Sequence, residues 1–465
     1  MLLVTIQVNS YSGSMKVDNK SITMMKVGVF LALLAETYLN AALPSLMATF
    51  GVPRESVQWL TSLYILTMGL SVPISAFLIN TRGTKELFVG SLTLFFIGTI
   101  GGGFAFSFPT LLIARIIQAV GASVTLPLMI HSIMVSYEKQ DRGKAMGSAM
   151  LVVLFAPAIG PAVGALVMQL LSWRWIFFTT SIVIALILIW GQFNMKEETK
   201  ARTIKVDYLS IVLSIIGFGG FVYGLQRTLS NSPHFGVSIG ITLVGVLSIT
   251  WFILRQRVLD SPMLDLSPFA SSTFSLGSSL IIICHMAVFG SFILLPMYLV
   301  EVIGVTPLKA TIAMIPGGFI GALAPSLAGR MYDTSGPKRV AITGFVLLSV
   351  ANILIAQREL HTSVTIISLI YVVLLSGFGL TLTPIKTHSL SQLEPKMMGS
   401  GTAILNTAML ISSSIGGSLF VALMASKAQV SSFVRGFTFS YWIAAAVSLI
   451  GVILSLFFRS SPDLT

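Results

Sequence analysis

The feature that most constrains this chain is a series of fourteen apolar runs, each of which is long enough to cross a bilayer. A transmembrane helix needs about 20 apolar residues. Inside lipid, a backbone must satisfy its own hydrogen bonds, which favours helices for runs of this kind. The runs lie at 25–47, 57–79, 86–106, 109–135, 144–170, 174–193, 206–226, 236–254, 273–299, 307–328, 338–356, 363–387, 399–425 and 437–458. We therefore predict an all-α polytopic membrane protein with fourteen transmembrane helices.

The composition agrees with a membrane protein and excludes several other classes. Charged residues make up 9% of the chain, against roughly 25% in soluble domains, and the mean hydropathy is +0.92. The net charge of +12 is spread over short loops, so it does not indicate nucleic-acid binding. The single cysteine, Cys284, excludes an intrachain disulfide and a multi-cysteine metal site. We expect no metal, no cofactor and no catalytic site, because the chain has no nucleotide-binding or metalloprotease motif.

The lysines and arginines between the runs fall unevenly on the two sides of the predicted membrane, which sets the orientation. The basic-poor side holds only Arg54, Arg174, Arg227, Lys309, Arg358, Lys427 and Arg435, while most of the other basic residues fall on the opposite side. We predict that both termini are cytoplasmic and that the protein lies in a bacterial-type cell membrane. Residues 1–23 are expected to be disordered, and Met15 is an alternative start.

An internal repeat divides the chain. The segment AFLINTRGTK at 76–85 aligns with GRMYDTSGPK at 329–338, and each follows the second helix of a six-helix group. We predict a six-helix bundle over 24–194, two inserted helices over 195–258 and a second, pseudo-symmetric six-helix bundle over 259–460. Parallel halves with a binding site between them are a known transporter architecture.

Glu36 is the most informative polar residue, because it lies near the middle of the first apolar run. A carboxylate at that depth costs about 2.5–3.5 kcal/mol or more, so it should face protein or a wet cavity. Asn40 lies four residues later, on the same helix face. A buried carboxyl that only bonds a polar neighbour is the structural alternative to a functional acid.

Other buried polar residues allow two interpretations. Arg115 is either a functional cation or a brace that binds backbone carbonyls of neighbouring helices. His285 is either a titrating group or a hydrogen-bonded packing residue. Asp207 opens the seventh run, where capping of the helix N-terminus is the better interpretation.

The motifs of this sequence are similar to those of a known family of membrane proteins. The chain resembles the major facilitator superfamily and, within it, the 14-helix drug–proton antiporters of the quaternary-ammonium and multidrug-exporter type. The superfamily loop pattern G-x-L-x-D-R-x-G-R-K aligns with Ala76, Leu78, Asn80, Gly83 and Lys85, where the amide of Asn80 replaces the acid, and its second copy keeps Gly329, Asp333, Gly336 and Lys338. Arg115, Gln118, Gly121 and Pro127 match the fourth-helix pattern, and Gly160, Pro161 and Gly164 match the exporter pattern of the fifth helix.

The resemblance implies roles for these residues. It implies proton coupling by Glu36 and Arg115, a substrate cavity that includes Glu36, Asn40, Gln118 and His285, and conformational roles for the loop and fifth-helix motifs. One departure concerns the first helix, where the branch has its acid at the position of Ala35, while this chain has the carboxylate at Glu36. One residue turns a helix by about 100°, so the two positions face different walls.

We therefore expect a monomeric, proton-coupled exporter of lipophilic, often cationic drugs and antiseptics. Methionine and aromatic side chains in a cavity can repack around varied ligands, and a single carboxylate attracts cations. A dedicated exporter of one physiological amphiphile or lipid is the alternative from the same class. A non-transporting membrane sensor or channel is an alternative from another class.

Overall fold

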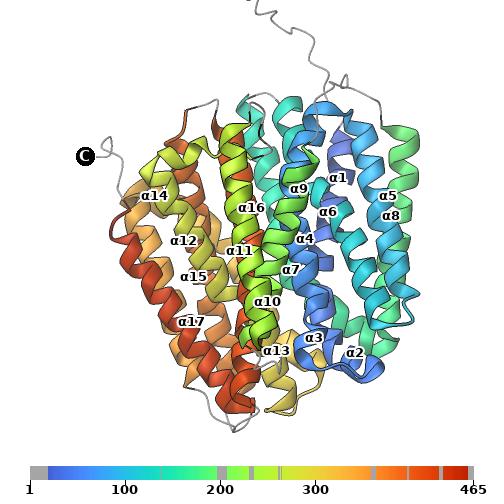
Figure 1. Cartoon of the computed structure of the whole chain (residues 1–465), viewed down its shortest axis with the longest axis vertical. Coiled ribbons are helices and arrows are strands. Elements are labelled where there is room, and N and C mark those ends of the chain that lie inside the picture. Colours follow the sequence, from blue (N-terminus) through green and yellow to red (C-terminus); the bar gives the residue numbers. More distant parts are fainter. Residues whose placement is uncertain are drawn as a thin grey trace, which may run out of the picture.

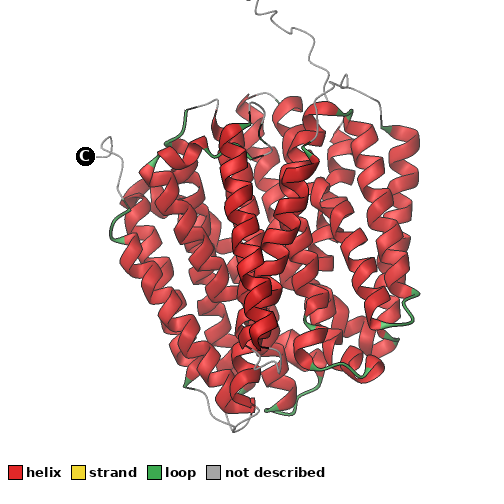
Figure 2. Cartoon of the chain, in the orientation of Figure 1, coloured by secondary structure: helices red, strands yellow, loops and turns green. Residues whose placement is uncertain are grey.

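A computed structural model describes residues 19–137, 139–195, 207–229, 235–259, 262, 264–357, 363–394, 397–428 and 433–458. Over these residues every regular element is helical, and no strand is present (Figure 2). The helices stand side by side, with their long axes roughly aligned (Figure 1). The predicted all-α membrane fold is therefore confirmed.

The helices correspond closely to the predicted runs. The first half holds α1 (Asn19–Thr37), η1 (Tyr38–Ala42), α2 (Leu43–Phe50), α3 (Arg54–Val57), α4 (Trp59–Thr81), α5 (Thr84–Gly103), α6 (Phe108–Ser136), α7 (Lys139–Leu170) and α8 (Trp173–Asn194). Next come α9 (Tyr208–Ser214), η2 (Ile215–Gly219), α10 (Gly220–Leu229) and α11 (Phe235–Val258). The second half holds η3 (Ser267–Ala270), α12 (Ser272–Phe289), α13 (Ser291–Glu301), α14 (Pro307–Ala356), α15 (Val364–Ser391), α16 (Met398–Ala428) and α17 (Phe433–Ser455).

Twelve helices of the described chain are long and apolar enough to cross a membrane. A thirteenth span is formed if the bent pair Leu151–Pro157 and Ile159–Leu170, which meet at 44°, counts as one. The predicted run 57–79 corresponds to α4, whose apolar stretch Trp59–Ser71 is shorter than the length that a span needs. The count of fourteen therefore stays a prediction.

Two local differences from the sequence-based expectation concern the first half. Residues 19–23, expected in a disordered segment, already belong to α1, while residues 1–18 lie outside the described residues. The first span changes to a 3₁₀ helix, η1, at Tyr38 and returns to α-helix at Leu43. Tighter 3₁₀ pieces within a helix often mark functional positions.

The two halves pack against each other along two seams. Helices α4 to α8 gather on one side of Figure 1, and α12, α14, α15 and α17 gather on the other. Across the boundary, α4 packs against α16, and α7 packs against α14. This arrangement agrees with two bundles joined at an interface, although the exact domain boundaries stay a prediction.

The repeat motifs form equivalent helix breaks. Gly83 separates α4 from α5, and the aligned Gly336 interrupts α14 with φ 75° and ψ 165°. That conformation is accessible to glycine but strained for other residues, because a Cβ would clash with the backbone. Gly336 therefore marks a kink at the start of the second of two spans, Pro307–Tyr332 and Thr334–Ala356, which correspond to the separate runs predicted there.

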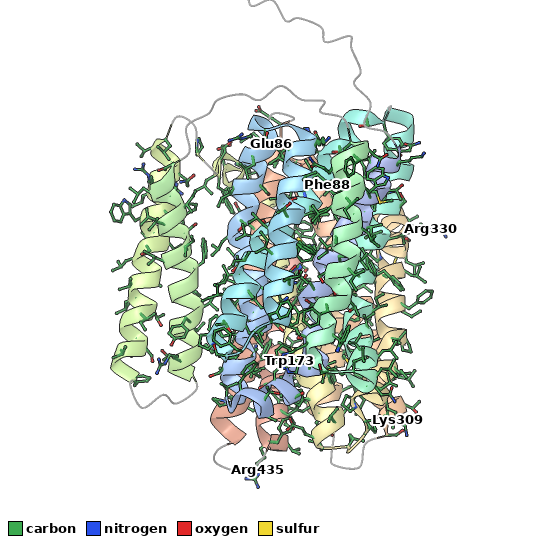
Figure 3. The ribbon with its side chains drawn as sticks, turned by 90° about the vertical axis from the view of Figure 1, so that its right-hand side faces the viewer. Glu86, Phe88, Trp173, Lys309, Arg330 and Arg435 are labelled. Atoms are coloured by element: carbon green, nitrogen blue, oxygen red, sulfur yellow. The ribbon has the colours of Figure 1, made fainter. Side chains whose placement is uncertain are left out.

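The inserted helices form an edge pair (Figure 3, yellow-green ribbons at one side). They rest on α4 and α16 through a small cluster centred on Leu66, Val222 and Ile411. Their ends are joined by Arg255, whose Nε and Nη2 donate to the two carboxylate oxygens of Asp207 at 2.9 and 3.0 Å. Asp207 also accepts from the backbone nitrogen of Ser210, which confirms its predicted role as an N-cap.

Large apolar side chains cover much of the outer surface, as a lipid-facing wall requires. Phe193 on α8 is 82% exposed and Leu247 on α11 is 67% exposed. In water, such a surface would be an aggregation hazard. Its presence agrees with the membrane location inferred from hydropathy.

The predicted orientation has a direct test. Lys309 and Arg435 lie at one end of the molecule, and Glu86 lies at the other (Figure 3). In a Cys284→Ala background, Glu86→Cys should be protected from an impermeant thiol reagent in intact cells, and Arg435→Cys should be labelled. Labelling of both would contradict the positive-inside assignment.

The Asp207–Arg255 pair predicts a measurable stabilisation. Arg255→Gln should lower the thermal unfolding midpoint of the protein, whereas Arg257→Gln, an exposed neighbour, should not. The hydrogen bonds from Arg255 lower the pKa of Asp207 to about 2. The stabilisation should therefore be complete above the unfolded-state pKa near 4 and disappear as the pH falls towards 2. An equal difference between wild type and Arg255→Gln at pH 7 and pH 2 would contradict this account.

Candidate functional site

A cavity of about 170 Å³ lies between the two halves of the molecule. Its first-half wall consists of Leu33, Glu36, Met68, Ser123, Leu126, Pro127, Val153 and Pro157. Its second-half wall consists of His285, Phe289, Phe292, Gly318, Gly321, Ala322, Leu375, Phe378, Leu382, Asn406, Met409, Leu410 and Ser413. Most of these side chains are apolar, so the cavity suits the lipophilic part of a ligand.

Glu36 lies in the wall of this cavity, in the last turn of α1 before the 3₁₀ segment. Its side chain is nearly buried, with 4% of the residue exposed. Among the described residues, its carboxyl forms no hydrogen bond or ion pair. The structural alternative, in which a polar neighbour holds the carboxyl, therefore finds no support in the described part of the chain.

Ala35, at the position of the family acid, faces elsewhere. It is fully buried, does not line the cavity, and its carbonyl oxygen accepts a hydrogen bond from Arg115 Nη2 at 2.9 Å. The shift of the acid by one residue therefore moves it from a position outside the cavity lining to a position within it. The carboxylate of this chain lies on the cavity side of α1, while the backbone carbonyl of the preceding residue accepts from Arg115 on α6.

Arg115 is fully buried and joins three helices. Its Nε donates to the carbonyl of Leu60 on α4 at 2.9 Å, and its Nη2 donates to Ala35 on α1. The guanidinium lies 4.0 Å from the centroid of the Tyr64 ring, and the Tyr64 hydroxyl donates to Ala32 O at 2.8 Å. These contacts match the carbonyl-brace interpretation of Arg115, and a cation over an aromatic ring adds further attraction.

Gln118 belongs to this network. Its Oε1 accepts from Arg115 Nη1, and its Nε2 donates to the hydroxyls of Tyr38 and Thr99 at 3.1 and 2.8 Å. Gln118 is fully buried and is not among the cavity-lining residues. Its amide is saturated by these partners, so its place is in the brace around Arg115.

Asn40 connects the two halves of the molecule. Its Oδ1 accepts from Thr61 Oγ1 at 2.9 Å, and its Nδ2 donates to the carbonyl of Phe292 at 3.3 Å. Asn40 lines a smaller neighbouring cavity of about 10 Å³ and is absent from the lining of the central one. The structure therefore places Asn40 at a contact between the halves, next to the central cavity.

His285 does lie in the central cavity, on the second-half wall. Its Nδ1 is 2.9 Å from the carbonyl oxygen of Ile281, one turn earlier. Its ring stacks on Phe289 at 5.6 Å and meets Phe378 edge-on at 5.2 Å. His285 thus combines cavity exposure with the packing contacts of the structural alternative.

The fifth-helix motif forms a tight contact with the first span. A Cβ added at Gly160 would overlap the Thr37 hydroxyl, and one at Gly164 would overlap the carbonyl oxygen of Tyr38. Thr37 Oγ1 also donates to Pro157 O at 2.9 Å. Small residues allow such close approach of helices. The segment after Glu36 therefore rests directly on α7.

The remaining motif residues lie away from the cavity. Gly83 and Gly336 form the helix breaks described above, and Gly329 lies in α14 with open space around it. Lys85, Pro161 and Lys338 belong to helices and do not line the cavity, while the side chain of Asn80, in α4, lies outside the described residues. The side chain of Asp333 lies outside the described residues.

Asn406 is a cavity residue that sequence reasoning missed. A signal was present, because it is a lone amide in the apolar run 399–425, as Glu36 is a lone acid in the first run. Ser123 and Ser413 gave no such signal, because serine is common in transmembrane helices. Among the described residues, no group of three or more His, Cys, Asp or Glu side chains is placed to hold a metal ion.

Comparison with known proteins covers almost the entire chain. The family model described as Major Facilitator Superfamily matches residues 27–286 and 277–465. The lincomycin resistance protein LmrB of Listeria innocua is 32% identical over 446 residues, covering 93% of this chain and 95% of that protein. LmrB of Bacillus subtilis is 35% identical over 401 residues (85% and 83%), and the multidrug export protein EmrB of Escherichia coli is 26% identical over 407 residues (87% and 79%).

The contact between Gly164 and Tyr38 predicts the effect of a single methyl group. Gly164→Ala should push α7 away from η1 and reduce transport at unchanged membrane expression, because the methyl would meet the backbone. Gly240→Ala on α11 is the matched control, since a Cβ there meets nothing within 4 Å. Equal transport by both variants would show that the contact is loose.

Proposed function

Because the chain belongs to the major facilitator superfamily, we propose that it is a secondary exporter that moves lipophilic, often cationic drugs and antiseptics out of the cell in exchange for protons. The single observation that carries the coupling is the position of Glu36. It is an acid in the wall of an apolar cavity between two packed halves, and its carboxyl forms no hydrogen bond or ion pair with any described residue. The relatives named as lincomycin resistance and multidrug export proteins support the export of drugs.

The carboxyl of Glu36 couples the two fluxes by competition. As an anion, it attracts a cationic ligand that has entered the cavity from the cytoplasm. When it takes a proton from the outside, that attraction ends and the ligand leaves. Loss of the proton to the cytoplasm restores the anion. The site therefore holds either a cation or a proton, and each cycle exchanges one for the other.

Arg115 supports this exchange from the adjacent wall of α1. Its guanidinium is held by the carbonyls of Leu60 and Ala35, and Ala35 directly precedes Glu36 in the chain. In a low-dielectric interior, a fixed charge acts over such distances. Arg115 thus holds α1 in the rotation that directs Glu36 to the cavity and supplies a permanent field there.

The proposal also covers the oligomeric state, the membrane location and the partners of the protein. We place the chain as a monomer in a bacterial-type cell membrane, with both termini cytoplasmic and no enzymatic activity. The proposed partners are small lipophilic substrates, protons and the surrounding lipid. Export of one physiological amphiphile or lipid is the alternative, and a range of unrelated transported compounds would argue against it. Membership in a transporter family argues against a sensor or channel.

Glu36→Gln tests the coupling directly. The amide keeps the shape of the side chain but cannot bind or release a proton, so the purified variant in proteoliposomes should lose proton release driven by a cationic drug. Glu36→Asp should retain part of it. The double variant Ala35→Asp, Glu36→Gln should not recover activity, because Ala35 does not line the cavity.

Controls separate coupling from folding. Arg257→Gln, on the exposed end of α11, serves as the control variant, because it changes the charge of an exposed side chain. The neighbouring Gln256→Glu would be unsuitable as a control, because Gln256 is buried. If Glu36→Gln pumps a dication against its gradient as well as wild type does, the coupling acid lies elsewhere. Rescue by the double variant would show that the cavity accepts an acid at either position.

A further inference from the structure

The polar groups of the central cavity differ in whether they have a hydrogen-bond donor left for a ligand. The hydroxyl of Ser123 donates to Val120 O at 2.7 Å, and that of Ser413 donates to Met409 O at 2.7 Å. Both donors are therefore used within their own helices, and only acceptor lone pairs remain.

The two titratable residues of the cavity present acceptors as well. A carbonyl only accepts, so His285 Nδ1, which is 2.9 Å from Ile281 O, carries a proton. In the neutral imidazole, the other nitrogen, Nε2, is then an acceptor. The ionised carboxylate of Glu36 is an acceptor only. All these groups suit the N–H of a protonated amine on the ligand.

Asn406 differs from them because of Lys386. The Nζ of Lys386 on α15 is 2.8 Å from Asn406 Oδ1 on α16. An ammonium has donors and no acceptor, so its partner must be the amide oxygen and not the amide nitrogen. This contact fixes which end of the Asn406 amide is occupied. Lys386 itself is not among the residues that line the cavity.

The amide nitrogen of Asn406 is consequently the group with donors to offer. Asn406 lines the cavity and is only half-buried, and its Nδ2 forms no hydrogen bond with any described residue. Among the described polar residues of the cavity wall, it provides the free N–H groups, while Glu36 and His285 provide acceptors. Asn406 lies on the second half of the chain, and Glu36 lies on the first half.

The geometry points to an acceptor-binding subsite at Asn406, held in position by Lys386, which selects amphiphiles carrying an oxygen acceptor in addition to a protonated amine. A carbonyl, ether or hydroxyl oxygen accepts from Asn406 Nδ2, while the amine meets the acceptors at Glu36. Such a ligand contacts both halves of the protein at once. This inference rests on the proposed function, because it names the substrate class of the same cavity.

A pair of matched amines tests the subsite. Dodecylamine and octyloxypropylamine have equally long chains with one terminal amine, and the second has an ether oxygen in place of a methylene. For the purified wild type, we expect octyloxypropylamine to bind about five-fold more tightly, since one neutral hydrogen bond contributes a net ~1 kcal/mol. Dissociation constants are measured for both amines, and substrate-driven proton release is measured in proteoliposomes.

Variants assign the preference to named atoms. Asn406→Asp keeps the shape and the contact with Lys386 but replaces the N–H donors by an acceptor, so the five-fold preference should disappear. Lys386→Met frees the amide to turn and should reduce the preference, whereas Lys386→Arg should retain it. Thr402→Val is the control, because Thr402 lies one turn from Asn406 on α16, outside the cavity, with its hydroxyl bonded to Met398 O.

The outcomes separate the subsite from the proposed function. Equal affinity of wild type for the two amines, or an unchanged preference in both Asn406→Asp and Lys386→Met, would overturn the subsite. The affinity ratio is obtained whether or not either amine is transported. Failure of both amines to drive proton release would count against the exporter, while a preference that vanishes in Asn406→Asp would still support the subsite.

Discussion

The buried guanidinium of Arg115 is the interaction on which the arrangement of the first half depends. A charge without exposure to water is tolerated only when it is hydrogen-bonded, and here the carbonyls of Leu60 and Ala35 and the amide oxygen of Gln118 accept from the guanidinium. The same bonds tie α6 to α4 and α1. One of these bonds ends on the carbonyl of Ala35, and the next residue, Glu36, lines the cavity.

The region next to Glu36 combines close packing with irregular backbone. Just after the carboxylate, α1 gives way to the 3₁₀ segment η1, which lies against Gly160 and Gly164 of α7. A helix that approaches another so closely can slide only as a unit, because there is no side chain between them to rearrange. The backbone just after the acid is therefore in direct contact with α7.

Among the described residues, few polar groups of the central cavity remain free to contact a ligand. Ser123 and Ser413 use their donors within their own helices, which leaves Glu36, His285 and Asn406 to meet a ligand. Apolar rings such as Phe289 and Phe378 accept many shapes, since dispersion and hydrophobic contact have little directionality. The proposed substrate site therefore combines an apolar wall with polar groups on both halves of the chain.

The sequence by itself determined the membrane class, most helix positions and the burial of Glu36 away from lipid, because bilayer thickness fixes the length of an apolar run and a lone acid in lipid is costly. It also identified the break at Gly336 through the repeat, and the cap at Asp207. Only the tertiary structure decided which wall each polar group faces. Gln118 is bonded to Arg115, Asn40 lies at a contact between the two halves, and Asn406 lines the cavity while its amide oxygen accepts from Lys386. Such assignments depend on the rotation of each helix and on partners far away in the chain, and hydropathy along a single run contains neither.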